Sequence, residues 1–541
     1  MRSKGIRVHY QNALVNDYLY NFSAVREFFT YDPFSSESFK RRHAYLTKKT
    51  NQNRESVVET LRDYNAKLGA GKQTMENIEA LRQEDAVVVV TGQQAGILGG
   101  PLYTVYKALT AIQLAKKASA ELGVPVIPLF WIASEDHDFG EINHVQVADR
   151  EGQPHKVTLS YEPGGKYSIG DIPVPEIDGF LDELAALIPE TEFKAEELGF
   201  FRASAAESDN LANWFGKILL RWLGTFGLVL VNPAERNFRS LERALFTAAI
   251  NNSAQVNTLL HTANSALMAK DYPVTVEKDP ANVNLFMYWE KERLPLLLTG
   301  DGYTLRGSDK RFTKQELIAL IEQKPELFSP KVELRPLSQD ELFPTLAYVG
   351  GPGEISYFAE YQEIYRLFGL EMPVIFPRAN LTVLDGGTEK YINKYRLGLE
   401  DLLQRPEEIR TEFLAAADEF GIEGIFSSLT DKVSAAYAET IDAVQKLNPS
   451  LEKLGLENRE RVLSQVHWLK EKTLQAHRQA NDTFLRQFRK LCNGLAPRQQ
   501  FQERFYGAIQ LVFKYGPALF TQLGEVPLID TQDHKLIFLK D

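Results

Sequence analysis

The residues of this sequence that could do chemistry gather directly after short apolar runs. The first group follows the valine-rich run 87–90 and holds two glutamines and four glycines between residues 92 and 100. Glycine lets the backbone turn tightly and lets a ligand approach it closely, and the start of a helix behind such a turn favours an anion. The pattern predicts a phosphate or carboxylate site made of Gly92, Gln93, Gln94, Gly96, Gly99, Gly100 and Tyr103.

Two alternatives stay open for this first group. Its glycines could serve only the packing of a tight strand-to-helix turn, and Lys107 could be a solvated residue as readily as a site residue. The spacing is neither GxGxxG nor GxxxxGK[ST], so it predicts neither a dinucleotide-binding fold nor a Walker loop.

A second group, Ser134–Glu135–Asp136–His137–Asp138, follows the apolar run 125–133. A histidine among carboxylates can accept or donate a proton. We predict that Asp136, His137 and Asp138 are catalytic and that Ser134 contacts a ligand. Helix capping by Ser134, with acids in the first turn, is the alternative, but it leaves the last three residues unexplained. No zinc-ligand spacing accompanies the group, so no metal site is predicted.

A third group, Gly350–Gly351–Pro352–Gly353–Glu354, follows the run 346–349. Gly351 and Gly353 would let a ligand approach, and Glu354 could accept a pair of hydroxyl groups; a strained turn with a capping acid is the alternative. Other strand ends carry three more candidate binding residues, Arg335, Arg378 and Asn380. An arginine can hold a carboxylate or phosphate through two parallel hydrogen bonds, although each of these two could equally form a structural ion pair.

The elements that must position these groups indicate an α/β protein, in which ligands bind at the carboxyl ends of parallel strands. Five apolar runs are predicted strands: 87–90, 125–133, 226–231, 346–349 and 373–376. Residues 1–85 are predicted to be mostly helical, as are 239–270 and the segment 355–370. Hairpin-like alternation predicts one insertion near 144–200, and a second β-rich insertion is predicted near 273–333.

A helical domain is predicted over residues 386–500, after a core domain of residues 1–385. Apolar and small residues step by four and three from Val462 to Thr483, which is typical of a coiled-coil seam. A break at Asn448–Pro449 predicts an antiparallel hairpin that either closes on itself or binds a second copy, and we expect a homodimer. The tail, 501–541, is expected to pack back on the core.

Composition narrows the class of protein. A chain of 541 residues exceeds what one hydrophobic core usually holds, and its net charge of −11 argues against nucleic acid as the main partner. No apolar run reaches the ~18 residues of a membrane helix, and the N-terminus lacks a signal core. With one cysteine, Cys492, expected to be a packing thiol, these features predict a cytoplasmic protein without disulfides.

Four segments together resemble the bacillithiol biosynthesis cysteine-adding enzyme family: VVVVTGQQAGILGGPLYTVYKALTAIQLAK, PLFWIASEDHDFGEINH, RPLSQDELFPTLAYVGGPGEISYFAEY and PVIFPRANLTVLD. The resemblance covers essentially the whole chain. It implies a Rossmann-like core similar to class I aminoacyl-tRNA synthetases and nucleotidyltransferases, with two inserted connecting segments and a dimerising helical domain. The implied activity is a ligase that joins L-cysteine to the amino group of glucosaminyl malate, with ATP or a related nucleotide and Mg²⁺.

The resemblance also suggests roles for the predicted residues. The cysteine carboxylate would be activated first, and His137 or Asp138 would then take a proton from the attacking amine. Glycine N–H groups, with Gln93 and Gln94, would stabilise negative charge, and Arg335 or Arg378 would hold the malate carboxylates. The alternatives are a nucleotidyltransferase that acts on another small acid, and a non-catalytic coiled-coil scaffold.

Overall fold

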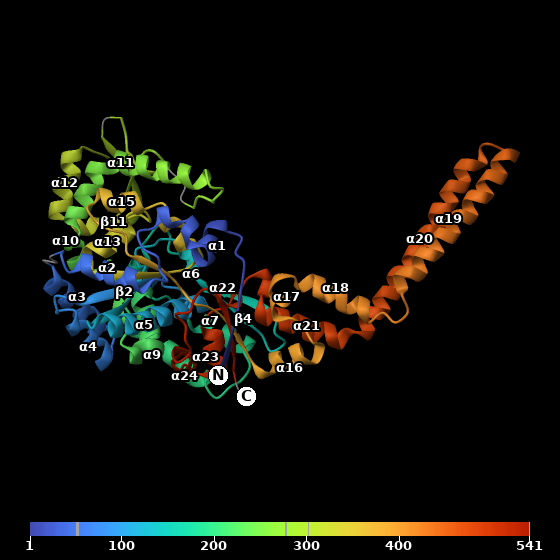
Figure 1. Cartoon of the computed structure of the whole chain (residues 1–541), viewed down its shortest axis with the longest axis horizontal. Coiled ribbons are helices and arrows are strands. Elements are labelled where there is room, and N and C mark those ends of the chain that lie inside the picture. The colour runs from blue at the N-terminus through green and yellow to red at the C-terminus, as the bar shows by residue number, and fades with distance from the viewer. Residues whose placement is uncertain (50–52, 276–278, 301, 540–541) are drawn as a thin grey trace. The chain divides into compact units, whose positions relative to one another are not determined.

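The computed structural model describes residues 1–49, 53–275, 279–300 and 302–539. The chain divides into two compact units (Figure 1). Of the described residues, the core unit holds 1–383 and 500–539, and the helical unit holds 384–499. None of the helices in the described part of the chain is long and apolar enough to cross a membrane.

A five-stranded, fully parallel sheet lies at the centre of the core unit, in the order β13-β12-β2-β3-β6. All five predicted strands are confirmed as its members: β2 (Val87–Gln93), β3 (Val126–Ile132), β6 (Val229–Val231), β12 (Thr345–Gly350) and β13 (Val374–Pro377). The chain adds β3 and β6 on one side of β2, then returns to add β12 and β13 on the other. The strand order therefore reverses between β2 and β12, the place where open α/β sheets bind ligands.

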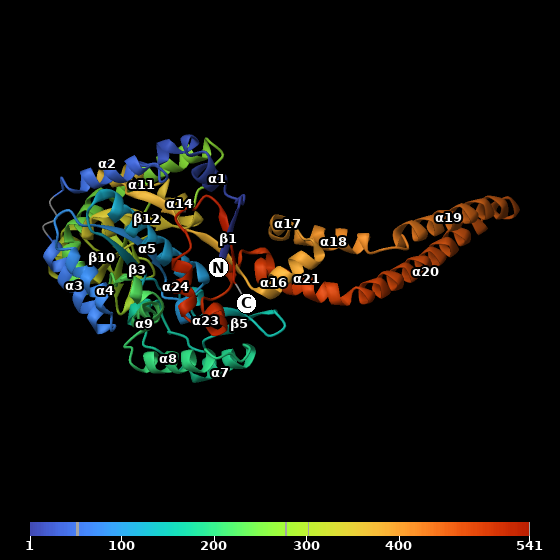
Figure 2. The ribbon, with the colours of Figure 1, turned by 60° about the horizontal axis from the view of Figure 1, so that its bottom comes forward.

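Both faces of this sheet are covered, which explains why its strands are almost uninterrupted apolar runs. Alternate residues of β3 enter different hydrophobic clusters: Phe130 and Ile132 on one face, Leu129 and Trp131 on the other. Helix α5 (Leu102–Leu122) connects β2 to β3 and packs on the first face with α9 (Leu211–Leu223). Figure 2 shows the helices on either side of the strands.

The first insertion is only partly the predicted set of hairpins. Strands β4 (His144–Ala148) and β5 (Pro154–Thr158) form an antiparallel hairpin. The residues after it include two helices, α7 (Asp178–Leu187) and α8 (Lys194–Ala206). Their buried leucine and phenylalanine side chains join the core cluster that also contains α5 and α9.

The second insertion is β-rich, as predicted. It forms a five-stranded antiparallel sheet in the order β10-β9-β8-β7-β11. Its strands are β7 (Asn282–Trp289), β8 (Glu292–Leu298), β9 (Tyr303–Leu305), β10 (Arg311–Phe312) and β11 (Phe328–Pro330), and helix α12 (Lys314–Gln323) lies between the last two. Residues 276–278 and 301 of the predicted range lie outside the described residues.

The two ends of the core unit meet in a third sheet. Strand β1 (Arg2–Ile6) pairs antiparallel with β15 (His534–Phe538), which lies beside β14 (Asn380–Leu384). Residues 1–85 are mostly helical, as predicted; β1 is the exception, because its partner strand is at the far end of the sequence. Helices follow, as predicted: α1 (Ala13–Tyr20), α2 (Ser36–Leu46), α3 (Arg54–Lys67) and α4 (Lys72–Ala80).

The remaining core helices are short apart from α11. They are α6 (Phe139–Ile142), α10 (Arg236–Leu241), α11 (Arg243–Met268), α13 (Arg335–Leu342), α14 (Pro352–Phe358), α15 (Gln362–Leu367), α22 (Gln502–Phe505), α23 (Ile509–Tyr515) and α24 (Ala518–Gly524). The predicted single helix over 355–370 is therefore two helices, α14 and α15.

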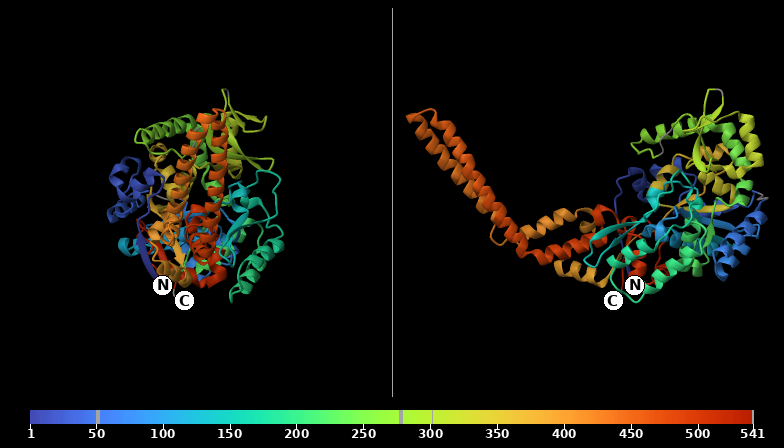
Figure 3. Two further views of the ribbon diagram at one scale, coloured as in Figure 1. Left: turned by 90° about the vertical axis from the view of Figure 1, so that its right-hand side faces the viewer. Right: turned by 180° about the vertical axis from the view of Figure 1, so that it is seen from behind.

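The helical unit contains a long antiparallel hairpin of α19 (Ile422–Leu447) and α20 (Leu451–Ala480), which confirms the predicted break (Figure 3). Gly455 lets α20 approach Ile441 of α19 closely. The predicted seam does not run unbroken to Thr483, because α20 ends at Ala480 and Thr483 lies in α21 (Asp482–Leu495). Shorter helices complete the unit: α16 (Gly386–Tyr395), α17 (Leu399–Gln404) and α18 (Pro406–Ala416).

Candidate functional site

A cavity of about 370 Å³ lies at the carboxyl ends of β2 and β12, where the strand order reverses. Nine of the predicted site residues line it: Gly92, Gln93, Gln94, Tyr103, Arg335, Gly351, Gly353, Glu354 and Arg378. The lining also includes Lys107, Trp131, Ala133, Val332, Tyr348, Pro352, Tyr357 and Arg504. The sheet thus brings together side chains that lie more than 400 residues apart in the sequence.

The place between β2 and β12 where the strand order reverses is called the switch point, and the cavity there the switch-point cavity. An ion pair between Lys107 and Glu354 joins its two sides. The Lys107 ammonium lies 2.5 Å from the Glu354 carboxylate and donates to the Gly92 carbonyl at 2.8 Å and to Gln93 Oε1 at 3.1 Å. Glu354 also accepts from the Gly351 N–H, at 2.7 Å, and from the hydroxyl of Tyr348. Lys107 is therefore a buried structural cation rather than a solvated residue.

Burial and the attraction between the two charges act in opposite directions on the pKa values of Lys107 and Glu354. Burial lowers the pKa of Lys107, and Glu354 opposes the shift. Burial works to raise the pKa of Glu354, but Lys107 and the Gly351 N–H together hold it below the usual value. Since three donor groups already occupy its oxygens, Glu354 has little capacity left for ligand hydroxyls. It acts instead as the capping acid of α14, the alternative that the sequence left open.

Arg335 presents an unused hydrogen-bond donor at the cavity. Its guanidinium lies over the rings of Tyr348 and Trp131, with centroids at 5.1 and 5.9 Å. One terminal nitrogen donates to Gln339 at 3.3 Å, whereas the other, Nη2, is buried without a hydrogen-bond partner among the described residues. A buried donor without a partner costs free energy, so a ligand carboxylate here would be stabilising.

Arg378, by contrast, is committed to the protein. It pairs with Glu503 at 2.7 Å and donates to the Ala379 carbonyl at 2.8 Å. Arg504 follows Glu503 in the sequence, and its guanidinium lies 5.9 Å from the Tyr103 ring centroid. Within the described chain Arg504 has no carboxylate partner. The cavity therefore has two balanced ion pairs and two unbalanced cations, Arg335 and Arg504, which suits a ligand with two negative charges.

The group 134–138 lies beside the cavity and does not line it. Ser134 is buried and donates to Asn232 at 2.6 Å, so its predicted contact with a ligand is not supported. Asp136 is connected to the cavity because the amide of Gln94 donates to it at 2.6 Å. Asp138 is exposed to solvent.

His137 packs edge-on against Phe286, at 5.7 Å between ring centroids. Its Nδ1 is buried without a hydrogen-bond partner in the described structure. Burial lowers the pKa of His137, and the nearby Arg293 adds to this shift. The imidazole is therefore neutral near pH 7 and able to accept a proton.

Three glycines of the first group serve packing rather than ligand contact. The N–H groups of Gly96, Gly99 and Gly100 donate within the turn itself. A side chain at Gly99 would lie 2.3 Å from the Trp222 ring, and its φ of +86° also favours glycine. None of the three lines the cavity, and neither does the buried Asn380. The predicted anion cradle of glycine N–H groups is thus replaced by arginine side chains.

Sequence reasoning missed several lining residues. Trp131 and Tyr348 lie inside predicted strands, and strand alternation could have placed them. No local signal marked Arg504, which is brought to the cavity by the segment that follows the helical unit.

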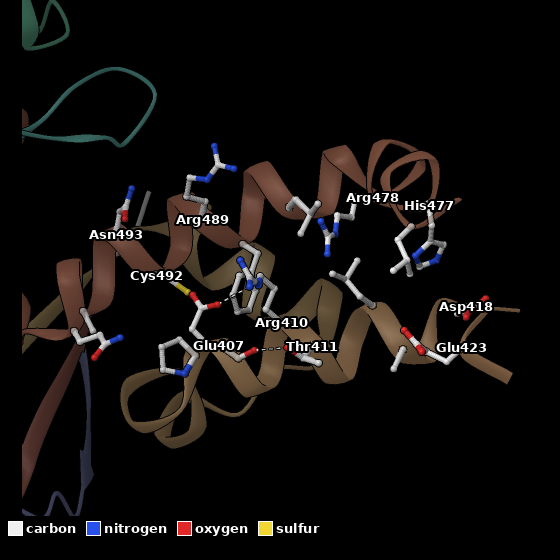
Figure 4. A pocket seen from close by; sticks show the side chains of 18 of the residues that line it. Glu407, Arg410, Thr411, Asp418, Glu423, His477, Arg478, Arg489, Cys492 and Asn493 are labelled. Atoms are coloured by element: carbon white, nitrogen blue, oxygen red, sulfur yellow. Dashed lines mark hydrogen bonds and ion pairs between the residues drawn. The ribbon is translucent and has the colours of Figure 1, made fainter. Parts of the chain in front are cut away.

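The helical unit contains a second, larger cavity, of about 990 Å³, between α18 and the helices α20 and α21 (Figure 4). Arg410, Arg478 and Arg489 lie along it with Cys492. Burial raises the pKa of the Cys492 thiol to about 12, and Glu407 adds to the shift. Cys492 is therefore a protonated thiol on a helix, which agrees with the packing role expected for it.

Comparison with known proteins decides the family. The family model "Bacillithiol biosynthesis BshC, N-terminal Rossmann-like domain" matches residues 1–379, and the model of the BshC C-terminal coiled-coil domain matches residues 381–539. The chain belongs to the BshC family. The family gives it a role in bacillithiol biosynthesis, a Rossmann-like core and a coiled-coil domain.

Full-length relatives agree with the match. The chain is 36% identical to a protein of Desulforamulus reducens, over 99% of this chain and 100% of the relative. It is 38% identical to a protein of Symbiobacterium thermophilum, over 96% and 97%, and 31% identical to one of Carboxydothermus hydrogenoformans, over 100% of both chains. All three carry the name "Putative cysteine ligase BshC".

Proposed function

We propose that this BshC protein is a carbon–nitrogen ligase that joins L-cysteine to the amino group of glucosaminyl malate, the last step of bacillithiol synthesis. The observation that carries the proposal is the pair of unbalanced guanidinium groups, Arg335 and Arg504, at the switch-point cavity. A malyl group has two carboxylates, and an arginine can hold each of them. Arg335 and Arg504 thus take the role that was predicted for Arg335 or Arg378.

Amide formation from a free carboxylate is uphill in water, so the cysteine carboxyl group requires activation. ATP or a related nucleotide with Mg²⁺ is the proposed activator. The N–H groups of Gly96, Gly99 and Gly100 donate within the turn, so the cations of the cavity are the groups that suit an anionic co-substrate.

His137 is the proposed general base for the attacking amine. It is neutral near pH 7, and Asp136, next to it in the chain, accepts a hydrogen bond from Gln94 in the cavity wall. Gln93 and Gln94 supply amide donors toward developing negative charge.

The first experiment is a mass-resolved assay with cysteine, glucosaminyl malate, Mg²⁺ and ATP, each omitted in turn. We expect the amide product only when all are present, with AMP or ADP identifying the mode of activation. Pyrophosphate release triggered by a different small acid would support a nucleotidyltransferase instead. No product and no binding of any substrate would contradict the proposal and support a scaffold.

The arginine assignment has its own test. Arg335→Gln and Arg504→Gln should each raise KM for glucosaminyl malate at least tenfold, since each removes a charge-assisted hydrogen bond of about 1.5–3 kcal/mol. Arg366→Gln, at an exposed arginine of α15, is the matched control and should leave KM unchanged. Unchanged KM in both cavity variants would refute the assignment.

We also propose that the coiled-coil unit makes the protein a homodimer. The α19–α20 hairpin pairs within one chain, yet no residue of α20 is buried, and Trp468 and Leu469 are 57% and 49% exposed. A second copy would cover this apolar surface. Light scattering should give a dimer for the parent and a monomer for Leu469→Asp; a monomeric parent would contradict the proposal.

A further inference from the structure

A third cavity, of about 420 Å³, lies in the core unit between the two insertions. Its walls are the rings of Tyr161, Tyr167 and Tyr288, and Asp171 and Lys291 add one charge of each sign. None of the predicted site residues lines it. The pocket combines flat apolar faces with polar groups, which is the general character of small-molecule sites.

Hydrogen bonds tie this pocket to the candidate active site. Ser168 donates to the Glu135 carbonyl at 3.0 Å, the Ile169 N–H to the Asp136 carbonyl at 2.8 Å, and the Gly170 N–H to the Ser134 carbonyl at 2.8 Å. The next residue after Gly170 is Asp171 of the pocket, and the residue before Ser134 is Ala133 of the switch-point cavity. The turn 133–137, which carries His137, is therefore connected to both cavities.

The polar groups of the pocket are available to a ligand. Within the described residues, the carboxylate of Asp171 has no hydrogen-bond or ion-pair partner, and the ammonium of Lys291 has none either. Partial desolvation raises the pKa of Asp171, which remains exposed at the pocket mouth, and no cation is close enough to oppose the shift. Since the lining holds one acid and one base, the pocket lacks the excess positive charge that a phosphate or a dicarboxylate would need.

We propose that this pocket binds the pyranose ring of the acceptor substrate. Tyrosine faces cover the apolar C–H faces of a sugar ring, a carboxylate accepts from its hydroxyl groups, and an ammonium donates to them. The ring would then lie next to the turn with His137, and the malyl group attached to it would extend toward the switch-point cavity. This inference rests on the proposed function for the identity of the acceptor, but not for the existence of a sugar site.

The test uses the full chain with separate probes for the two halves of the acceptor, D-glucosamine and malate. Binding of each is followed by saturation-transfer NMR and titration at millimolar concentrations. Asp171→Asn and Tyr167→Ala should each weaken glucosamine binding about tenfold or more, and should leave malate affinity within twofold of the parent. Arg335→Gln should do the reverse.

Glu183→Gln, at an exposed acid of α7 in the same insertion, is the matched control and should change neither affinity. The melting temperature of each variant identifies any that has lost its fold. Glucosamine binding that is absent in the parent, or unchanged in both pocket variants, would overturn the proposal. If ligation of cysteine fails while glucosamine still depends on Asp171, the proposed function falls and the sugar site stands.

Discussion

Substituting Lys107 with methionine tests whether the switch point depends on a buried ion pair. The variant keeps an unbranched apolar stem but removes the cation that contacts Glu354, the Gly92 carbonyl and Gln93. Breaking a buried pair by removing one partner costs about 3–5 kcal/mol, because the other charge is left uncompensated. Glu354 keeps the donors Tyr348 and Gly351, so we expect the lower end of this range, about 3 kcal/mol.

The loss should depend on pH in a definite direction. Without the Lys107 ammonium, burial acts on Glu354 with less opposition and raises its pKa in the folded chain. An acid whose pKa is higher in the folded than in the unfolded chain destabilises the fold above the unfolded pKa, and this penalty disappears below it. The difference between Lys107→Met and the parent should therefore shrink from about pH 8 to about pH 5.

Urea unfolding followed by tryptophan fluorescence measures this effect, because four of the five tryptophans lie in the core unit. Lys117→Met, at an exposed lysine of the same helix, is the control and should change stability by no more than about 0.5 kcal/mol. Combining Lys107→Met with Glu354→Gln should cost less than the sum of the single changes. Additive single changes, or a loss no larger than that of the control, would refute the reasoning.

Three further predictions follow from the site. Gly99→Ala should lower the melting temperature strongly, because the φ of Gly99 is positive and the Trp222 ring of α9 fills the space that a side chain would need. Gly353→Ala, with no atom within 4 Å of the added carbon, is the control and should not lower it. Equal melting temperatures would argue against the packing role. Gln94→Glu should cut ligation at least tenfold with the fold intact, because it replaces an amide donor by a third carboxylate; near-normal turnover would remove this amide from the site. Arg293→Gln should raise the pKa of His137, seen as an upward shift of its NMR titration, since a neighbouring positive charge is removed; an unchanged titration would show that burial alone lowers the pKa.

Much of the core could be predicted because its signals are local. The valine-rich run of β2, the turn 350–354 and the break at Asn448–Pro449 each carry their pattern within a few residues. Strand β1 could not be predicted in this way, since it is a strand only through its pairing with β15 at the other end of the chain. The helices α7 and α8 were missed because the hairpin alternation before them was extended too far along the insertion.

The candidate site shows the same difference between local signals, which the sequence carries, and long-range contacts, which it does not. The sequence by itself determined which strand ends carry glycine, amide and charged side chains, because strand length, turn chemistry and apolar patterning are properties of neighbouring residues. Only the tertiary structure decided which charges are free: it pairs Lys107 with Glu354 and Arg378 with Glu503, and it leaves Arg335 and Arg504 without carboxylate partners in the described chain. The physical reason is that burial and charge balance depend on partners distant in the sequence, and such partners leave no local pattern.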